Sequence, residues 1–159
     1  MATLPQLIEE DIRQVDEVLA EFVNQADLLG ALIIDKGGFL ITHQGNTGDL
    51  DLTTIGALAS GAFMASQTIA GLVNEKNFNS TFQQGEKFSL YILEVDSECL
   101  LAVIFCSATG LGLVKYYGNT AAAAIARQLG LARERNPAGG FDLSMMNLAN
   151  PGELFRKKI

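Results

Sequence analysis

The sequence predicts an α+β fold in which one antiparallel sheet is flanked by helices. Segments with the helical period of three and four alternate with short apolar runs that are typical of strands. Glycine and polar turn residues separate the strand-like runs, as in antiparallel hairpins. The chain has 159 residues, of which 48% are hydrophobic and 18% are charged. We therefore expect one domain with a sizeable core and no disorder over the whole chain.

The first element is an amphipathic helix, expected from Pro5 to Gln25. Pro5 suits the first position of a helix because an N–H group has no helical partner there. The helix has one apolar stripe and one acidic side, and the stripe consists of Ile8, Ile12, Val15, Leu19 and Phe22. A hairpin is expected next, with strands at Leu28–Ile34 and Phe39–His43 and a turn at Asp35-Lys36-Gly37-Gly38.

A second helix is expected from Leu52 to Asn74, and its 23 residues include no charge. Asp51 or Thr53 is expected to cap it. A stripe at helical spacing is expected to pack on the sheet, namely Ile55, Leu58, Ala62, Ala65, Ile69 and Leu72. The reverse face is small and uncharged, with Thr53, Ala57, Ser60, Met64, Gln67, Thr68 and Gly71. Surface helices normally carry charge on such a face, so we expect it to contact another protein.

Two alternatives for this helix remain open. Twenty-three uncharged residues are long enough to cross a membrane, but the hydroxyl and amide side chains are too polar for a typical span, so no membrane partner is expected. The helix can also be sandwiched inside the fold, although few other elements remain to cover its second side.

The second half of the chain is expected to contain three strands and a helix. Residues 75–85 are expected to be a polar connection. The expected strands are Lys87–Val95, which alternates between apolar and polar residues, Cys99–Phe105, which is continuously apolar, and Leu111–Tyr117. Asn119 or Thr120 is then expected to cap a helix that ends near Arg133.

The C-terminal region is expected to be separate from the folded domain. Pro137-Ala138-Gly139-Gly140 interrupts the pattern, so we expect a domain at residues 1–136 and a mobile tail at residues 137–159. Asn150-Pro151 is typical of a helix start, and a short helix from Gly152 to Lys158 is expected on binding. Its apolar contacts would be Leu154 and Phe155.

The charge pattern limits the partners. The net charge is −7, and the one basic block is Arg156-Lys157-Lys158, so binding to nucleic acid or to an anionic membrane is not expected. The first residues carry acids where a signal peptide carries bases, so a cytoplasmic protein is expected. Cys99 and Cys106 lie too far apart along one expected strand for a disulfide, and both are expected to be reduced and buried.

A search for catalytic patterns finds no strong candidate. The sequence has neither a GxxxxGK nor a GxGxxG motif, and a single histidine, His43, supports neither a metal site nor a catalytic triad. Gly118-Asn119-Thr120 would open a helix after a strand, where an anion can bind, but the glycine spacing of a phosphate loop is missing. Asp49 and Asp51 are expected to serve the helix N-terminus. We therefore expect a binding protein with no enzyme activity, metal or cofactor.

The arginines of the last expected helix are weak candidates for catalysis. Arg127, Arg133 and Arg135 are expected to form its solvated face rather than an arginine finger.

Several stretches of the sequence form a pattern that is distributed over many positions. They are Ile34–Gly38 with the following strand, Asp51–Thr54 through Leu58–Gly61, Leu72–Phe78, Gln84–Tyr91, Leu101–Phe105 and Leu111–Lys115. Together these stretches resemble the roadblock family of dynein-light-chain type domains, and within it the MglB-like bacterial polarity regulators. The resemblance covers roughly residues 5 to 135.

The resemblance implies the element order α-β-β-α-β-β-β-α, with the central helix on one face of the sheet and the other two helices on the opposite face. It also implies a homodimer, in which the third strand continues the sheet across the two-fold axis. That strand is taken here as Lys87–Val95. The expected interface residues are Lys87, Phe88, Ser89, Leu90, Tyr91, Ile92 and Leu93.

The resemblance further implies that the two central helices receive one Ras-like small GTPase of the MglA type. Such proteins stimulate GTP hydrolysis without an arginine finger, by favouring the active arrangement of the GTPase's own switch loops. The contact residues that carry over are Thr53, Ala57, Ser60, Gly61, Met64, Gln67, Thr68 and Gly71, with Leu154 and Phe155 from the tail. A scaffold that holds a GTPase or motor complex without activating it is the main alternative, and a small-molecule sensor domain is a weaker one.

Overall fold

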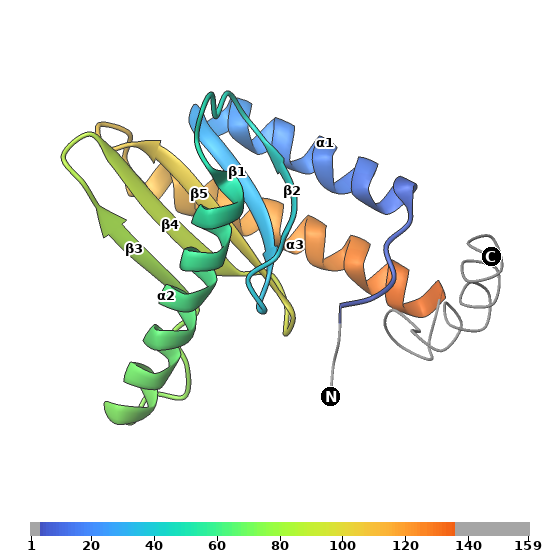
Figure 1. The fold of residues 1–159 in the computed structure, drawn as a ribbon. Helices are drawn as coiled ribbons and strands as arrows, with labels where there is room; N and C mark the ends of the chain where they lie inside the picture. Colours follow the sequence, from blue (N-terminus) through green and yellow to red (C-terminus); the bar gives the residue numbers. More distant parts are fainter. Residues whose placement is uncertain (1–3, 136–159) are drawn as a thin grey trace, which may run out of the picture.

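The computed structural model describes residues 4–135, which contain three helices and five strands in the expected order α-β-β-α-β-β-β-α. The elements are α1 (Glu9–Ala26), β1 (Leu28–Asp35), β2 (Leu40–Gln44), α2 (Leu52–Leu72), β3 (Ser80–Gln84), β4 (Phe88–Glu94), β5 (Cys99–Cys106) and α3 (Leu111–Arg135). The strands form one antiparallel sheet in the order β2-β1-β5-β4-β3, as Figure 1 shows. The predicted α+β class is confirmed, whereas the tail at residues 137–159, with Leu154 and Phe155, lies outside the described residues.

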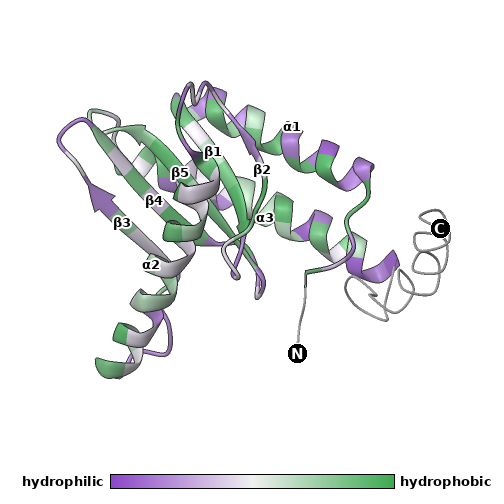
Figure 2. Ribbon diagram, viewed as in Figure 1, coloured by the Kyte–Doolittle hydropathy of each residue, from purple (hydrophilic) through white to green (hydrophobic). Residues whose placement is uncertain are grey.

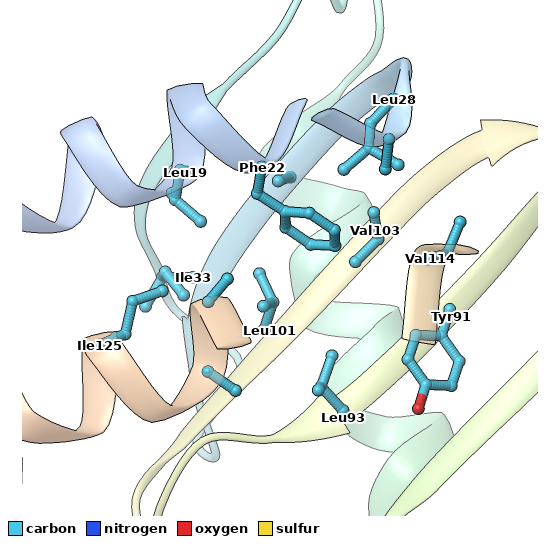
Figure 3. Packing of buried hydrophobic residues seen from close by; sticks show 14 of the residues in the cluster. Leu19, Phe22, Leu28, Ile33, Tyr91, Leu93, Leu101, Val103, Val114 and Ile125 are labelled. Carbon is cyan, nitrogen blue, oxygen red and sulfur yellow. The ribbon is translucent and has the colours of Figure 1, made fainter. Parts of the chain in front are cut away.

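The sheet separates two apolar layers. Helices α1 and α3 cover one face and α2 covers the other (Figure 1). Between α1, α3 and the sheet, Phe22 and Ile125 point toward Leu101 and Val103 of β5 (Figure 3). Leu100 and Ala102 of the same strand point to the α2 side. Strand β5 is therefore buried on both faces, which explains its continuously apolar sequence.

Helix α1 begins at Glu9, so the prediction that Pro5 occupies the first helical position is wrong. The start is fixed by Asp11, whose carboxylate accepts a hydrogen bond of 2.9 Å from the backbone N–H of Ile8. This bond satisfies a donor that would otherwise lack a helical partner. Val15, Leu19 and Phe22 face the core as predicted, but Ile8 is exposed.

Strand β3 lies within the segment that was predicted to be a polar connection. Its sequence, Ser-Thr-Phe-Gln-Gln, lacks the apolar alternation of a buried strand because β3 is an edge strand that is only partly covered. The ring of Phe82 stacks on that of Phe105 with centroids 6.2 Å apart, and this contact holds the edge against the core.

Helix α3 includes residues 111–117, which were predicted to be the last strand. Valine, leucine and tyrosine favour strands locally, but Val114, Gly118, Ala121 and Ile125 recur at helical spacing and are all buried. Burial along the whole helix overrides the local preference. The predicted caps at Asn119 and Thr120 are therefore wrong, since these residues lie inside α3. For the same reason Gly118-Asn119-Thr120 does not open a helix, in agreement with the missing glycine spacing of a phosphate loop.

Candidate functional site

The candidate site is helix α2, which begins where Asp51 caps it. The Asp51 carboxylate accepts bonds from the Thr54 hydroxyl at 2.6 Å and from the Thr54 backbone N–H at 3.1 Å. These bonds hold the pKa of Asp51 below its ordinary value. Of the two predicted caps, Asp51 is confirmed, and the exposed side chain of Thr53 stays free to contact a partner.

The predicted orientation of α2 on the sheet is wrong. Leu58, Ile69 and Leu72, which were expected to face the sheet, are 68%, 51% and 78% exposed. The buried residues of the helix are Leu52, Gly56, Ala59, Ser60, Phe63 and Ala70. The helix carries no charge on any side, so its sequence periodicity indicates a helix without indicating which side is buried.

Two residues show which side of α2 packs on the sheet. Phe63 is fully buried in a cluster with Ile34, Ile92 and Leu100. Gly56 lies over Ile34, and a β-carbon built on it would be in ordinary van der Waals contact with that side chain at 3.7 Å. The side of α2 that carries Phe63 and Gly56 is therefore the side that packs on the sheet.

Two residues of the predicted contact face, Ser60 and Gln67, form hydrogen bonds within the fold. Ser60 is buried, and its hydroxyl donates a bond of 2.8 Å to the carbonyl oxygen of Lys36 in the β1–β2 turn. The Gln67 amide donates to the carbonyl of Phe78 at 2.6 Å and accepts from the Phe78 N–H at 3.2 Å. Both side chains hold α2 in place. Ser60 is buried, so the prediction that it contacts a partner is wrong, whereas Gln67 is half-buried and its contact stays a prediction.

The remaining contact residues form what we call the outer ridge of α2. Its six members share one exposed side of the helix, and they are Thr53, Ala57, Gly61, Met64, Thr68 and Gly71. A second exposed side, the lateral ridge, is apolar and consists of Leu58, Ala65, Ile69 and Leu72. Figure 2 shows α2 in green and white along its length, whereas α1 and α3 carry purple segments. Exposed apolar surface of this extent marks an interaction site.

An aromatic residue that the sequence analysis did not select borders the outer ridge. Phe39 is 73% exposed at the start of β2. The backbone of its neighbour Gly38 has φ = 97°. A β-carbon built on Gly38 would lie 3.4 Å from the Cα of Ala57, which belongs to the outer ridge. The conformation suits glycine and brings the turn against α2. The sequence feature that could have pointed to Phe39 is its position directly after a glycine turn, where an aromatic side chain is commonly exposed to solvent.

The open edge of the sheet lies beside the lateral ridge. A shallow hollow of about 400 Å³ is lined by Ile55 of α2, Leu90 and Ile104 of the sheet, and the end of β3. At one end of β3, the backbone carbonyl of Asn79 accepts a hydrogen bond of 3.1 Å from the N–H of Glu94 in β4. At the other end, the N–H of Gly85 donates a hydrogen bond of 3.1 Å to the carbonyl of Phe88 in β4. Because antiparallel bonds alternate, the backbone groups of the residues between them, Ser80, Phe82 and Gln84, point to the open edge.

This topology corrects the strand predicted to pair across a two-fold axis. Strand β4 contains all the predicted interface residues except Lys87, which precedes it. It is hydrogen-bonded to β3 on one side and to β5 on the other. Its backbone groups have no free edge, so β4 cannot continue the sheet. The third strand of the fold is β3, and it is an edge.

Among residues 4–135 no cluster of three His, Cys, Asp or Glu side chains could hold a metal ion. Burial raises the pKa of the Cys99 thiol to about 12, with help from Asp96 and Asp35, so this thiol is not ionised at neutral pH. Cys106 is exposed, which corrects the prediction that it is buried, and both cysteines are free. His43 is exposed on β2 as predicted.

Helix α2 is the one described helix long and apolar enough to cross a membrane. In this fold its inner side packs on the sheet through Phe63 and Leu52, and its polar side chains bond to the β1–β2 turn and to Phe78. Core helices of globular proteins also pass such a test of length and composition.

Comparisons with known proteins agree with this architecture. The model of the Roadblock/LC7 domain matches residues 14–105. The structure of the gliding protein mglB from Thermus thermophilus is 30% identical, with a TM-score of 0.75, over 82% of this chain and 98% of that chain. Myxococcus xanthus MglB is 32% identical, with a TM-score of 0.68, over 71% and 92%. An uncharacterised protein of Methanocaldococcus jannaschii is 28% identical over 64% of this chain and 87% of its own.

Proposed function

The chain belongs to the Roadblock/LC7 domain family, and we propose that it is a homodimeric GTPase-activating regulator of a Ras-like small GTPase of the MglA type. The observation that carries this proposal is the exposed and uncharged outer ridge of α2 on a fold similar to MglB structures. Roadblock and MglB proteins are regulators rather than enzymes in the usual sense. The proposal places the protein in the cytoplasm, with neither nucleic acid nor a membrane as its partner.

In the proposed dimer, β3 of each protomer pairs with β3 of the other and the sheet becomes continuous. The open backbone groups of Ser80, Phe82 and Gln84 would then find partners. The lateral ridge would pack beside that of the second protomer, close to the hollow at Ile55 and Leu90. A two-fold axis of this kind uses the same patch twice, which makes the interface self-complementary.

The two outer ridges would then form one platform for the GTPase. Their glycine, alanine and threonine side chains let a partner approach the helix backbone closely, while Met64 and Phe39 supply larger apolar contacts. Burying such a face costs little because it holds no charge that would have to be removed from water. In this arrangement two protomers contact one GTPase.

The proposed mechanism requires no catalytic group from this chain. All four arginines of the described residues lie on α1 or α3, across the sheet from α2, and they are Arg13, Arg127, Arg133 and Arg135. The proposal therefore assigns none of them to the nucleotide. The platform would instead bind the active arrangement of the switch loops more tightly than the inactive one and thereby raise its population. The GTPase would supply the groups that act on the phosphate.

A GTPase assay under multiple turnover tests the proposal. The full-length protein should increase the rate of GTP hydrolysis by the cognate GTPase, and Met64→Arg should abolish both binding and stimulation because it places a charge in the centre of the platform. Leu113→Arg is the matched control, since Leu113 is 44% exposed on α3 and Met64 is 47% exposed on α2. Binding without any rate increase at saturating protein would replace the activator with a scaffold, and equal effects of both variants would refute the docking site.

A further inference from the structure

A second groove lies on the opposite side of the molecule, between α1 and α3. Its volume is about 570 Å³, and its apolar lining includes Val15 and Val18 of α1 with Ile125 and Leu131 of α3. Beyond Val18 and Ala124 it continues into a smaller hollow of about 100 Å³ that is bordered by Glu21. Leu131 is 54% exposed at its rim. The proposed dimer and GTPase platform use the other face, so neither of them covers this groove.

A glycine near the C-terminal end of α3 widens the groove. Gly130 is part of the lining, and a β-carbon built on it would meet nothing within 4 Å. Glycine inside a helix costs about 1 kcal/mol relative to alanine, so it is an unfavourable residue here unless the free space is used. The glycine leaves room for an incoming side chain against the backbone of α3.

The end of α3 delivers the chain to the mouth of this groove. Arg135, its last residue, bonds to the buried carboxylate of Asp11 near the start of α1, so the two helices run antiparallel. Twenty-four residues follow, and they begin with Asn136-Pro137-Ala138-Gly139-Gly140, which is suited to a reversal of direction. The groove runs along α3 from Arg135 to Tyr117, which is about 27 Å, and the 19 residues after Gly140 are long enough to follow it, since an extended chain spans about 3.3 Å per residue.

Charge and apolar residues of that segment match the groove in order. Helix α1 carries six acids and one base, and Glu17 and Glu21 lie toward the end far from Arg135. The segment ends in Arg156-Lys157-Lys158, directly after Leu154-Phe155. A chain that enters at Arg135 and follows the groove would bring its apolar pair to Val18 and its basic block to these acids.

We propose that residues 141–159 of this chain dock in the groove between α1 and α3, with Leu154 and Phe155 on its apolar lining and Arg156-Lys157-Lys158 against the acids of α1. A tail held there is unavailable to any other protein. Its release is then a step at which contacts of the tail with a partner can be regulated.

A single tryptophan can report this docking, because the chain contains none. In full-length protein carrying Phe155→Trp, we expect emission shifted to the blue and protection from a soluble quencher. Adding Gly130→Phe should fill the groove and return the emission to that of a free peptide of residues 141–159 that carries the same Phe155→Trp substitution. Gly112→Phe is the matched control, since Gly112 also lies in α3 with nothing within 4 Å of a built β-carbon. Glutamate at all three basic positions should weaken the docking as well.

Two results would overturn the proposal. One is the emission of a fully exposed tryptophan in the full-length protein with native Gly130. The other is a blue shift that Gly130→Phe does not reverse, which would place the tail elsewhere. Melting temperatures confirm that each variant is folded, and Leu131→Glu at the exposed rim provides a second way to block the groove. None of these measurements involves a GTPase, so their failure is distinguishable from failure of the proposed function.

Discussion

At the residue scale, one buried carboxylate joins the beginning of the described fold to its end. Asp11 accepts hydrogen bonds from the Ile8 backbone at 2.9 Å, from Gln128 at 2.8 Å and from Arg135. Burial alone would raise the pKa of Asp11, but the bonds from Arg135, Ile8 and Gln128 outweigh it, so the pKa lies below its ordinary value. The ionised form is therefore the one that stabilises the fold.

We predict that Asp11→Asn lowers the free energy of unfolding by about 2–3 kcal/mol at neutral pH, because it removes a charge that holds donors from three residues. The native pKa is depressed, so this contribution is present above the unfolded pKa of about 4 and is lost as the pH falls through the native pKa. Urea unfolding at several pH values measures it. The difference in the free energy of unfolding between wild type and Asp11→Asn should become smaller at acidic pH. Asp49→Asn, in an exposed loop, should have nearly the same free energy of unfolding as the wild type at any pH. A gap that does not depend on pH would contradict the prediction.

Several residue assignments could be made from sequence because they depend on local chemistry. Asp51 as a cap and the exposure of His43 follow from neighbouring residues. The inward positions of Ser60 and Gln67 could not, since their partners, Lys36 and Phe78, are brought near by the fold. Phe39 is a similar case, because its position next to α2 depends on how the hairpin packs.

At the element scale, helix α2 shows how a correct helix can be placed the wrong way round. Its sequence contains two stripes of apolar residues at helical spacing. The stripe that was predicted to face the sheet forms the lateral ridge, and the stripe that contains Phe63 is the buried one. The useful signal was Phe63, since it is the largest side chain of the helix and large aromatic rings gain most from burial.

Phe63 and its neighbour Met64 provide a direct test of the helix orientation. We predict that Phe63→Ala lowers the free energy of unfolding by about 3–5 kcal/mol, because it leaves a cavity between α2 and the sheet. Met64→Ala should change it by less than about 0.5 kcal/mol, because Met64 faces water. Urea titrations of the two variants at one protein concentration measure both values. Similar losses in the two variants would show that α2 is turned differently.

The two misplaced elements share a physical cause. Strand β3 has a polar sequence because an edge strand needs few apolar residues, and the start of α3 has a strand-like sequence because its burial is set by α1 and the sheet. Both errors concern segments whose structure is decided by packing rather than by local preference. Strands β1, β4 and β5, which are buried, were located within one or two residues.

At the scale of the whole molecule, the order of elements and the distribution of helices over the two faces were predicted, but the free edge was not. The sequence predicts five strands, and the structure has five. However, β3 was predicted to be a connection, and residues 111–117, which were predicted to be a strand, belong to α3. The edge follows from the pairing order alone, which places β4 inside the sheet and β3 outside. The periodicity of the sequence does not indicate the order in which strands pair in the sheet.

The open edge allows a test of the proposed dimer. We predict that Gln84→Pro makes the protein monomeric, because proline removes a backbone donor that points away from β4 and toward the second protomer. Analytical ultracentrifugation measures the change in mass. Gln84→Ala, which removes the side chain and keeps the N–H, should remain dimeric. If Gln84→Pro is folded and still dimeric, the protomers do not join through β3.

The missing charge on α2 also has a kinetic consequence. Oppositely charged surfaces attract each other over distance and accelerate encounters, whereas the outer ridge carries no charge with which to steer a partner. Unsteered proteins associate at about 10⁵–10⁶ M⁻¹ s⁻¹, with little response to ionic strength. The lifetime of a complex on this face would then be set by how slowly it dissociates. A cell could adjust occupancy chiefly through the abundance of the two proteins.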